Sequence, residues 1–560
     1  MYIIFLNNDT KVHKGWLSYL LNLLRKDDKI GMVGSKLIYP NGLLQEAGGI
    51  VWTNGECSNF GNGNNPEQPE YNYVKEVDYI SGASILIKKA LWEKIGGFDK
   101  RFIPAYYEDT DFAFELRKLG YKVIYQPKSI VEHYEGISNG KNLTDISNIK
   151  HYQIINKKKF IEKWKNELEN QQKRENIFTA RDRSMNKSRI LVVDIWVPNF
   201  DKDAGSRCCF MYLNLFIELG LQVTLLPGDL IKKEPYTTIL QQKGIEVLYG
   251  NSYFGKQMEV WLKNNLKYFR FVYFQRPIIT KKYIDLVRKY FHGKIFYFAH
   301  DLHHIRLMRE YNITHLRKTY LESINIKNIE FEIFQKVDVI HVVGSYEYEI
   351  LRKRFYNKTI RNIPLYIYKK QYDNIEKDFS KRKDLIFVGE FLHPPNIDAL
   401  IWFSKEIFPF IVQKYPNIVL HIVSSYTPSQ IRKLESKNIK FEGFLSDSNL
   451  HLMYQKCRIA IAPLRFGAGI KGKIVEAAYN QIPIVTTSIG AEGLNNSTKV
   501  FVVENNPIKM AKIICNLYTN YTQLKYMSNS GKYFIDKYFS FNRAKEIIMK
   551  DINLKNNCRK

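Results

Sequence analysis

Acidic and imidazole side chains lie at the ends of predicted elements in the first 140 residues. Asp9 follows an apolar run at residues 2–6, and Glu108 and Asp109 open a predicted helix. His133 follows a predicted strand after a short loop. Such a set suits a divalent metal that holds a diphosphate, with a further carboxylate as a general base for an acceptor hydroxyl. The structural alternative is that Glu108 and Asp109 cap the helix N-terminus.

A second group of polar residues occupies a glycine-rich stretch between a predicted strand and a predicted helix, residues 463–477. Its glycines open the backbone to a ligand, and its cations could bind a diphosphate. Glu476 lies one turn into the helix, where it could reach a ribose diol. An exposed basic helix start is the structural alternative. The candidate donor-binding residues are Arg465, Gly469, Lys471, Lys473, Glu476 and, in the next tight loop, Glu492.

Two shorter motifs follow earlier predicted strands. Gly205 opens a helix, and a helix N-terminus favours anions, although a glycine turn explains the residue equally well. Asp301 and His303 lie between a strand and a helix, where they could orient an acceptor hydroxyl. The alternative is that Asp301 caps that helix, and the spacing does not match a zinc site.

The positions of these candidates depend on a regular alternation of strands and helices that begins at residue 189. This alternation predicts a parallel α/β fold, with helices on both faces of each sheet. We expect two doubly wound domains, residues 189–370 and 371–540, with a ligand cleft at the carboxyl ends of their strands. The expected strands lie near residues 190–194, 222–227, 245–249, 269–275, 294–299, 337–343, 384–389, 418–423, 439–443, 458–463, 482–487 and 499–504.

The flanking segments are less regular. The apolar run at residues 2–6 predicts a strand that is buried on both faces and needs neighbours on both sides. We interpret residues 141–188 as a charged linker, with a helix near 156–175, and residues 541–560 as a basic tail.

The composition limits the function classes. The chain has 560 residues, with 84 Lys and Arg against 56 Asp and Glu, for a net charge of +28. This excess favours anionic partners, although enrichment in Lys, Ile, Asn and Tyr through codon usage gives the same balance.

The six cysteines form no C-x-x-C pair, which indicates reduced thiols. With no apolar run of ~18 residues and no signal peptide, we expect a cytoplasmic protein with peripheral membrane contact possible.

Residues 2–140 resemble glycosyltransferase family 2. The similar motifs are Phe5-Leu-Asn-Asn-Asp-Thr, Gly34-Ser-Lys-Leu-Ile-Tyr-Pro-Asn-Gly, Ser81-Gly-Ala-Ser, Gly96-Gly-Phe-Asp, Tyr107-Glu-Asp-Thr-Asp-Phe and His133-Tyr-Glu-Gly. The resemblance implies a GT-A fold and inversion, with Asp9 and His133 near a Mn or Mg ion and Asp109 as the base. In the family, a nucleotide-binding segment precedes this region. We therefore expect an incomplete, acceptor-side half, with a separately encoded N-terminal half as a possible partner.

Residues 189–540 resemble glycosyltransferase family 4. The similar motifs are Asp203-Ala-Gly-Ser, Phe387-Val-Gly-Glu-Phe-Leu-His-Pro-Pro-Asn-Ile-Asp-Ala, the stretch 463–477 and Gly490-Ala-Glu-Gly. The resemblance implies a GT-B fold, retention of the anomeric configuration and no metal. Of the family's two glutamates separated by seven residues, Glu476 fits the second, which binds ribose, and Ala468 occupies the first position.

Together these resemblances imply a two-module hexosyltransferase-type enzyme of surface polysaccharide or glycoconjugate synthesis, in which the family-4 module is active. The expected donor is a UDP-, GDP- or ADP-sugar, and the expected acceptor is a glycan or a lipid-linked glycan. The alternatives are a non-catalytic docking role for the family-2 region and a basic nucleic-acid-binding protein. Scattered lysines and the lack of a zinc-finger, RRM or KH pattern argue against nucleic acid.

Overall fold

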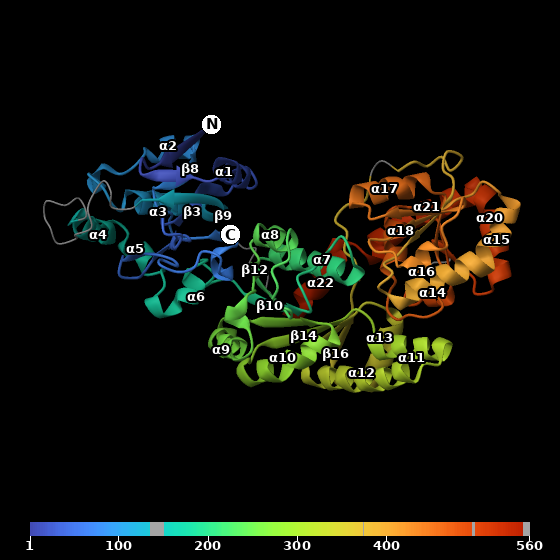
Figure 1. Cartoon of the computed structure of the whole chain (residues 1–560). Helices are drawn as coiled ribbons and strands as arrows, with labels where there is room; N and C mark the ends of the chain where they lie inside the picture. The colour runs from blue at the N-terminus through green and yellow to red at the C-terminus, as the bar shows by residue number, and fades with distance from the viewer. Residues whose placement is uncertain (135–150, 373–374, 495–498, 553–560) are drawn as a thin grey trace. The chain divides into compact units, whose positions relative to one another are not determined.

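The computed structural model describes residues 1–134, 151–372, 375–494 and 499–552 (Figure 1). The chain forms two compact units. The first contains Met1–Leu191 and Gly220–Arg270, and the second contains Val192–Leu219 and Phe271–Lys560. Helices and strands alternate in both, so the predicted α/β class is confirmed.

The first sheet is mixed and has seven strands, in the order β1-β8-β3-β9-β2, with β4 paired to β3 and β7 paired to β9. Strands β3 and β9 run parallel to each other, while the other pairs are antiparallel. Helices α1, α2 and α3 complete this part of the chain. The bounds are β1 (Tyr2–Leu6), β2 (Thr10–Val12), α1 (Trp16–Leu24), β3 (Ile30–Ile38), β4 (Leu44–Glu46), β7 (Lys75–Glu76), β8 (Ser84–Lys88), α2 (Lys89–Ile95), α3 (Glu108–Lys118) and β9 (Lys122–His133).

Strand β1 differs from its prediction. It lies at the end of the strand order and pairs antiparallel with β8. With a neighbour on one side only, Ile4 and Leu6 remain 39% and 42% exposed. The prediction of a strand buried on both faces is therefore wrong, because the apolar run forms an edge strand and not a central strand of the sheet.

Residues 152–180 fold against the core of the first unit. Phe160, Trp164 and Leu168 recur every four residues along α4 (Tyr152–Lys163) and α5 (Lys165–Leu168), so they share one helix face. All three are buried in the cluster that contains Trp52 and Phe114. The expected linker is therefore a structural part of this unit. Residues 141–150 of that prediction, and residues 135–140 of the predicted family-2 region, lie outside the described residues.

The second sheet has seven strands, in the order β12-β11-β10-β13-β14-β15-β16. The chain starts at β10 and adds strands on one side and then on the other, which is the doubly wound pattern. Helices α11 and α12 run side by side (Figure 1). The bounds are β10 (Arg189–Asp194), α7 (Ala204–Glu218), β11 (Gln222–Pro227), α8 (Tyr236–Gln241), β12 (Glu246–Val247), α9 (Lys256–Asn265), β13 (Phe271–Gln275), α10 (Pro277–Tyr290), β14 (Lys294–Ala299), α11 (His303–Thr314), α12 (Arg317–Lys336), β15 (Val339–Val342), α13 (Ser345–Arg354) and β16 (Thr359–Asn362).

The third sheet has six parallel strands, in the order β19-β18-β17-β20-β21-β22. Strand order reverses between β17 and β20, and doubly wound sheets bind ligands at the carboxyl ends beside such a switch. The bounds are β17 (Leu385–Val388), α14 (Pro394–Trp402), α15 (Phe408–Lys414), β18 (Leu420–Val423), α16 (Ser429–Arg432), β19 (Ile439–Gly443), α17 (Asp447–Lys456), β20 (Ile459–Ala462), α18 (Gly472–Tyr479), β21 (Ile484–Thr486), α19 (Ser488–Ala491), β22 (Phe501–Val503), α20 (Pro507–Thr519) and α21 (Tyr521–Tyr538).

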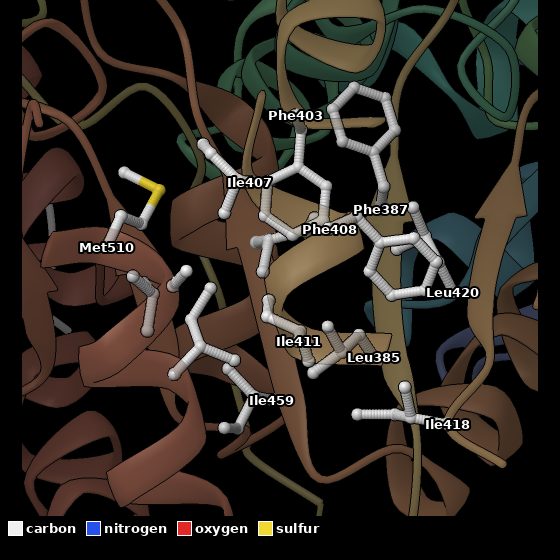
Figure 2. Close-up of a cluster of buried hydrophobic side chains, with 14 of the residues drawn as sticks. Leu385, Phe387, Phe403, Ile407, Phe408, Ile411, Ile418, Leu420, Ile459 and Met510 are labelled. Carbon is white, nitrogen blue, oxygen red and sulfur yellow. The ribbon is translucent and has the colours of Figure 1, made fainter. Parts of the chain in front are cut away.

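The core of this sheet is a single apolar cluster. Figure 2 shows side chains of β17, β18 and β20 meeting those of α15 and α20. Leu385, Phe403, Ile411 and Ile459 are fully buried. This packing fixes the strands whose ends carry the candidate residues.

The segment expected as a basic tail begins with a helix, α22 (Phe541–Ile552). Asp551 on this helix contacts His341 Nε2 and Arg361 Nε, both at 3.0 Å. Residues 541–552 are therefore part of the second unit, and residues 553–560 lie outside the described residues. Among the described helices, none combines the length and apolarity needed to cross a bilayer.

Candidate active sites

The glycine-rich loop between β20 and α18 lies at the switch point of the third sheet. Gly467 and Gly469 have φ angles of 150° and 66°, which side-chain-bearing residues rarely adopt. A Cβ atom on Gly469 would lie 2.6 Å from the carbonyl oxygen of His300. The loop therefore requires glycine both for its conformation and for its close contact with the segment after β14.

Glu476 lies in the interior of α18 and faces Arg207. Its Oε1 atom is 3.1 Å from Arg207 Nη1, and the Glu476 side chain is 14% exposed. The Tyr454 hydroxyl donates a hydrogen bond to Glu476 Oε2 at 3.5 Å. Burial raises the pKa of Glu476, and the charge of Arg207 opposes that effect. Sequence reasoning missed Arg207, although it stands two residues after the predicted Gly205.

The three predicted cations of this loop bind three different partners. Arg465 forms a two-point ion pair with Asp398, with Nε at 2.9 Å from Oδ2. Lys471 Nζ donates to the Gly469 carbonyl at 2.5 Å. Lys473 Nζ donates to Asn396 Oδ1 at 2.6 Å, and burial lowers the pKa of Lys473 to about 7. A diphosphate would have to compete with these contacts. We call Gly467, Gly469, Lys471, Lys473 and Glu476 the loop site.

Gly205 is the second residue of α7, and Asp203 Oδ1 accepts a hydrogen bond from Ser206 N at 2.8 Å just before it. A Cβ atom on Gly205 would lie 2.5 Å from Arg276 Nη2. Arg276 in turn contacts Asp194 Oδ1 at 2.9 Å. The glycine therefore permits an arginine to pack on the helix start, a role that does not depend on an anionic ligand.

Asp301 and His303 are brought together after β14. Asp301 Oδ1 lies 2.9 Å from His303 Nε2, and Oδ2 accepts from Arg306 Nε at 2.9 Å. Burial would raise the pKa of Asp301, but His303 and Arg306 hold it well below its usual range. Glu330, on α12, accepts from the backbone N–H of His303 at 2.9 Å. Glu330 therefore caps α11, and the capping alternative for Asp301 is wrong.

Glu492 forms an ion pair with Arg309, and Arg309 also contacts the backbone of the glycine-rich loop. Arg309 on α11 donates to both Glu492 oxygens, at 2.9 and 2.7 Å, and to the Gly467 carbonyl at 2.7 Å. Glu347 on α13 accepts from Gly469 N at 2.6 Å. Arg309 and Glu347 lie far from residues 463–477 in the chain, so local sequence patterns gave no sign of them.

In the first unit, the candidate metal residues meet at the end of the sheet. His133 Nε2 lies 3.3 Å from Asp9 Oδ1, and Nδ1 lies 3.1 Å from Gln45 Oε1. His133 is the last residue of β9, opposite Thr10, and not a loop residue as predicted. The described residues contain no group of three or more His, Cys, Asp and Glu side chains able to hold a metal ion.

Asp109 and Glu46 accept hydrogen bonds from adjacent backbone amides. Gly82 N donates to Asp109 Oδ2 at 2.8 Å, and Ser81 N donates to Glu46 Oε1 at 3.1 Å. Burial raises the pKa of Asp109, that of Glu108 to about 7 and that of Glu46 to about 8. Carboxyls with raised pKa values suit general acid–base work. Sequence reasoning missed Glu46. We call Asp9, Glu46, Glu108, Asp109 and His133 the strand-edge site.

Two regions of this chain match family models of glycosyltransferases. Residues 2–172 match the model described as "Glycosyl transferase family group 2", and residues 382–520 match "Glycosyl transferases group 1". The chain is similar in fold to sucrose-phosphate synthase from Thermosynechococcus elongatus, with a TM-score of 0.51 and 13% identity over 66% of this chain and 98% of that one. These findings confirm the two predicted resemblances and the α/β architecture.

Two curated relatives match shorter stretches. An uncharacterized 44.6 kDa protein in the cps region of Klebsiella pneumoniae is 28% identical over 176 residues, which are 30% of this chain and 45% of that protein. The O-antigen biosynthesis protein RfbC of Myxococcus xanthus is 28% identical over 144 residues, which are 24% of this chain and 11% of that protein. The chain thus spans less than half the length of either relative.

Proposed function

We propose that the protein is a glycosyltransferase of polysaccharide synthesis, which moves a sugar from a nucleotide-sugar donor to a glycan or lipid-linked glycan. The loop site is the proposed donor site. The observation that carries this proposal is the largely covered Glu476 carboxylate beside Arg207, one turn into the helix that follows a glycine-rich loop at a topological switch point. That is where a doubly wound sheet binds a nucleotide.

The proposed chemistry divides the residues of the loop site by charge. The donor diphosphate needs cations and backbone N–H groups, which Lys471, Lys473 and the glycine loop supply. The ribose needs a hydrogen-bond acceptor, which Glu476 supplies. Asp301 and His303 would orient the acceptor hydroxyl, since their contact fixes both side chains after β14. We infer retention at the anomeric carbon from the family-4 resemblance.

The strand-edge site is proposed to be the acceptor side of an inverting family-2 module that is silent in the purified chain, where the loop site alone is active. Asp109, with Glu108 beside it, would take the proton from an acceptor hydroxyl. Asp9 and His133 would bind Mn or Mg together with the diphosphate of a donor, and such an ion offsets the charge of the leaving group. The RfbC relative, named for O-antigen biosynthesis, supports a polysaccharide context for the whole chain.

A binding and hydrolysis screen tests the proposal. The purified chain would be titrated with UDP, GDP and ADP, and incubated with UDP-glucose, UDP-galactose, UDP-N-acetylglucosamine, GDP-mannose and ADP-glucose. We expect one nucleotide to bind without added metal and its sugar conjugate to be slowly hydrolysed. If no nucleotide binds and no conjugate is hydrolysed, the proposed function is wrong.

A further inference from the structure

A cavity of about 490 Å³ lies in the first unit. Its lining residues come from three segments that are distant in the sequence, within 60–71, 177–181 and 263–268. No residue of the loop site or of the strand-edge site borders this cavity in the part of the chain that the structure describes. Binding sites for small molecules have volumes of roughly 300–1,000 Å³. The cavity therefore has room for a ligand that neither candidate active site accounts for.

One wall of the cavity is held rigid by Arg181, which is almost wholly buried. Its Nη2 atom donates to both carboxylate oxygens of Glu246, at 2.7 and 2.9 Å. Its guanidinium carbon lies 4.3 Å from the centre of the Phe178 ring, and that ring stacks on Tyr268 with 4.9 Å between centres. Because these side chains fix one another, the cavity exists before a ligand enters, and binding does not have to order this wall.

The charges that face the cavity favour an anion. Lys263, near the end of α9, and Lys267, in the helical turn that follows, are both exposed, and neither forms an ion pair with a residue that the structure describes. Glu70 lines the cavity as well, and its Oε2 atom accepts from the Tyr253 hydroxyl at 3.3 Å. Since Glu246 balances the charge of the buried arginine, two lysines against one carboxylate leave one excess positive charge.

The rest of the wall is apolar. Phe60 and Tyr71 meet edge to face at 5.1 Å, and Ile177 is 49% exposed. An inorganic anion would use the lysines alone, and an apolar ligand would leave them without a partner. A saccharide with an acidic group uses every part of the wall. Its anion pairs with the lysines, its hydroxyls donate to the Glu70 carboxylate, and its C–H groups lie against the apolar side chains.

We propose that this cavity binds a segment of an acidic glycan, whose carboxylate or phosphate groups pair with Lys263 and Lys267. The cavity would hold the glycan by a segment that does not react, so that an acceptor or product chain stays on the enzyme between transfers. The choice of a glycan rests on the proposed function, whereas the preference for an anion rests on the cavity itself.

Four probes separate these contributions in calorimetric titrations of the full chain. Hyaluronan tetrasaccharide carries carboxylates, and mannose 6-phosphate carries a phosphate. Chitotetraose is a neutral tetrasaccharide, and inorganic phosphate is an anion without a sugar. The test variant is the double substitution Lys263→Gln and Lys267→Gln, which removes both charges from exposed positions. Lys256→Gln is the matched control, because Lys256 is an exposed residue of α9 that does not line the cavity.

We expect at least one of the two acidic saccharides to bind the wild-type chain about tenfold more tightly than chitotetraose and inorganic phosphate do. The double variant should weaken that binding about tenfold, the scale of two ion pairs at a partly exposed site, and Lys256→Gln should leave it unchanged. The inference is wrong if neither acidic saccharide binds, if chitotetraose or inorganic phosphate binds as tightly, or if the double variant binds as the wild type does. Nucleotide titration of the wild-type chain tests the proposed function separately, so the two failures are distinguishable.

Discussion

Lys473 illustrates how burial prepares a single side chain for an anion. Its ammonium group lies 4.5 Å from the centre of the Phe387 ring and donates to Asn396, and burial lowers its pKa to about 7. Above that pH the free protein therefore holds Lys473 largely neutral. A diphosphate beside it would favour the charged form, so binding above pH 7 has to take up a proton.

Nucleoside diphosphate affinity should consequently fall as the pH rises from 7 to 9, approaching a tenfold loss per pH unit. Calorimetry in buffers of different ionisation enthalpy measures both the Kd and the proton uptake. Lys473→Met should bind more weakly at pH 7 and lose this pH dependence. An unchanged pH dependence in that variant would show that another group takes up the proton.

A second prediction at the residue scale concerns the contact made by Gly469. Gly469→Ala should abolish measurable nucleotide binding, since the new Cβ would lie 2.6 Å from the His300 carbonyl and displace the loop. Gly443→Ala is the matched control, because Gly443 has a similar φ of 70° but a Cβ atom there would have no neighbour within 4 Å. It should cost about 1 kcal/mol of stability and leave binding intact. Equal effects of both substitutions on calorimetric binding would contradict the role of the close contact.

At the scale of elements, helix α4 should stabilise the first unit. Phe160→Ala removes a fully buried ring and should lower the free energy of unfolding by about 3–5 kcal/mol. Ile154→Ala, on the same helix but 47% exposed, should change it by less than about 0.5 kcal/mol. Hydrogen exchange of the β3 and β9 amides reports the stability of this unit. If these amides exchange at wild-type rates in Phe160→Ala, α4 is not part of the core.

The elements of the second and third sheets could be predicted because buried parallel strands are continuous apolar runs between helical patterns. A helix near residues 156–175 could also be predicted, but not its packing on the first unit, since its three large apolar residues are dispersed among Lys and Glu. The residues of the loop site also fall into two groups, those that a local sequence motif reveals and those that it does not. Glu476 stands in a local motif, whereas Arg207, Arg309 and Glu347 reach the loop from distant segments, and only the fold brings them there.

At the scale of the whole molecule, the net charge of +28 should produce electrostatic binding to anionic membranes. We expect the chain to co-sediment with vesicles of phosphatidylglycerol and phosphatidylcholine at low salt, and not with phosphatidylcholine alone. In 1 M salt, where the Debye length is about 3 Å, this binding should be lost. Co-sedimentation that persists in 1 M salt would indicate apolar insertion instead.

The central claim for the whole chain is that the loop site binds a nucleotide through Glu476. Calorimetric titration of the wild-type chain and of Glu476→Ala with UDP, GDP and ADP, without metal, tests it most directly. Glu546→Ala, an exposed residue on α22, is the control and should bind as the wild type does. We predict that Glu476→Ala weakens the preferred nucleotide by about 1–3 kcal/mol, the scale of hydrogen bonds to a charged group. Unchanged affinity for all three nucleotides in Glu476→Ala would contradict the account.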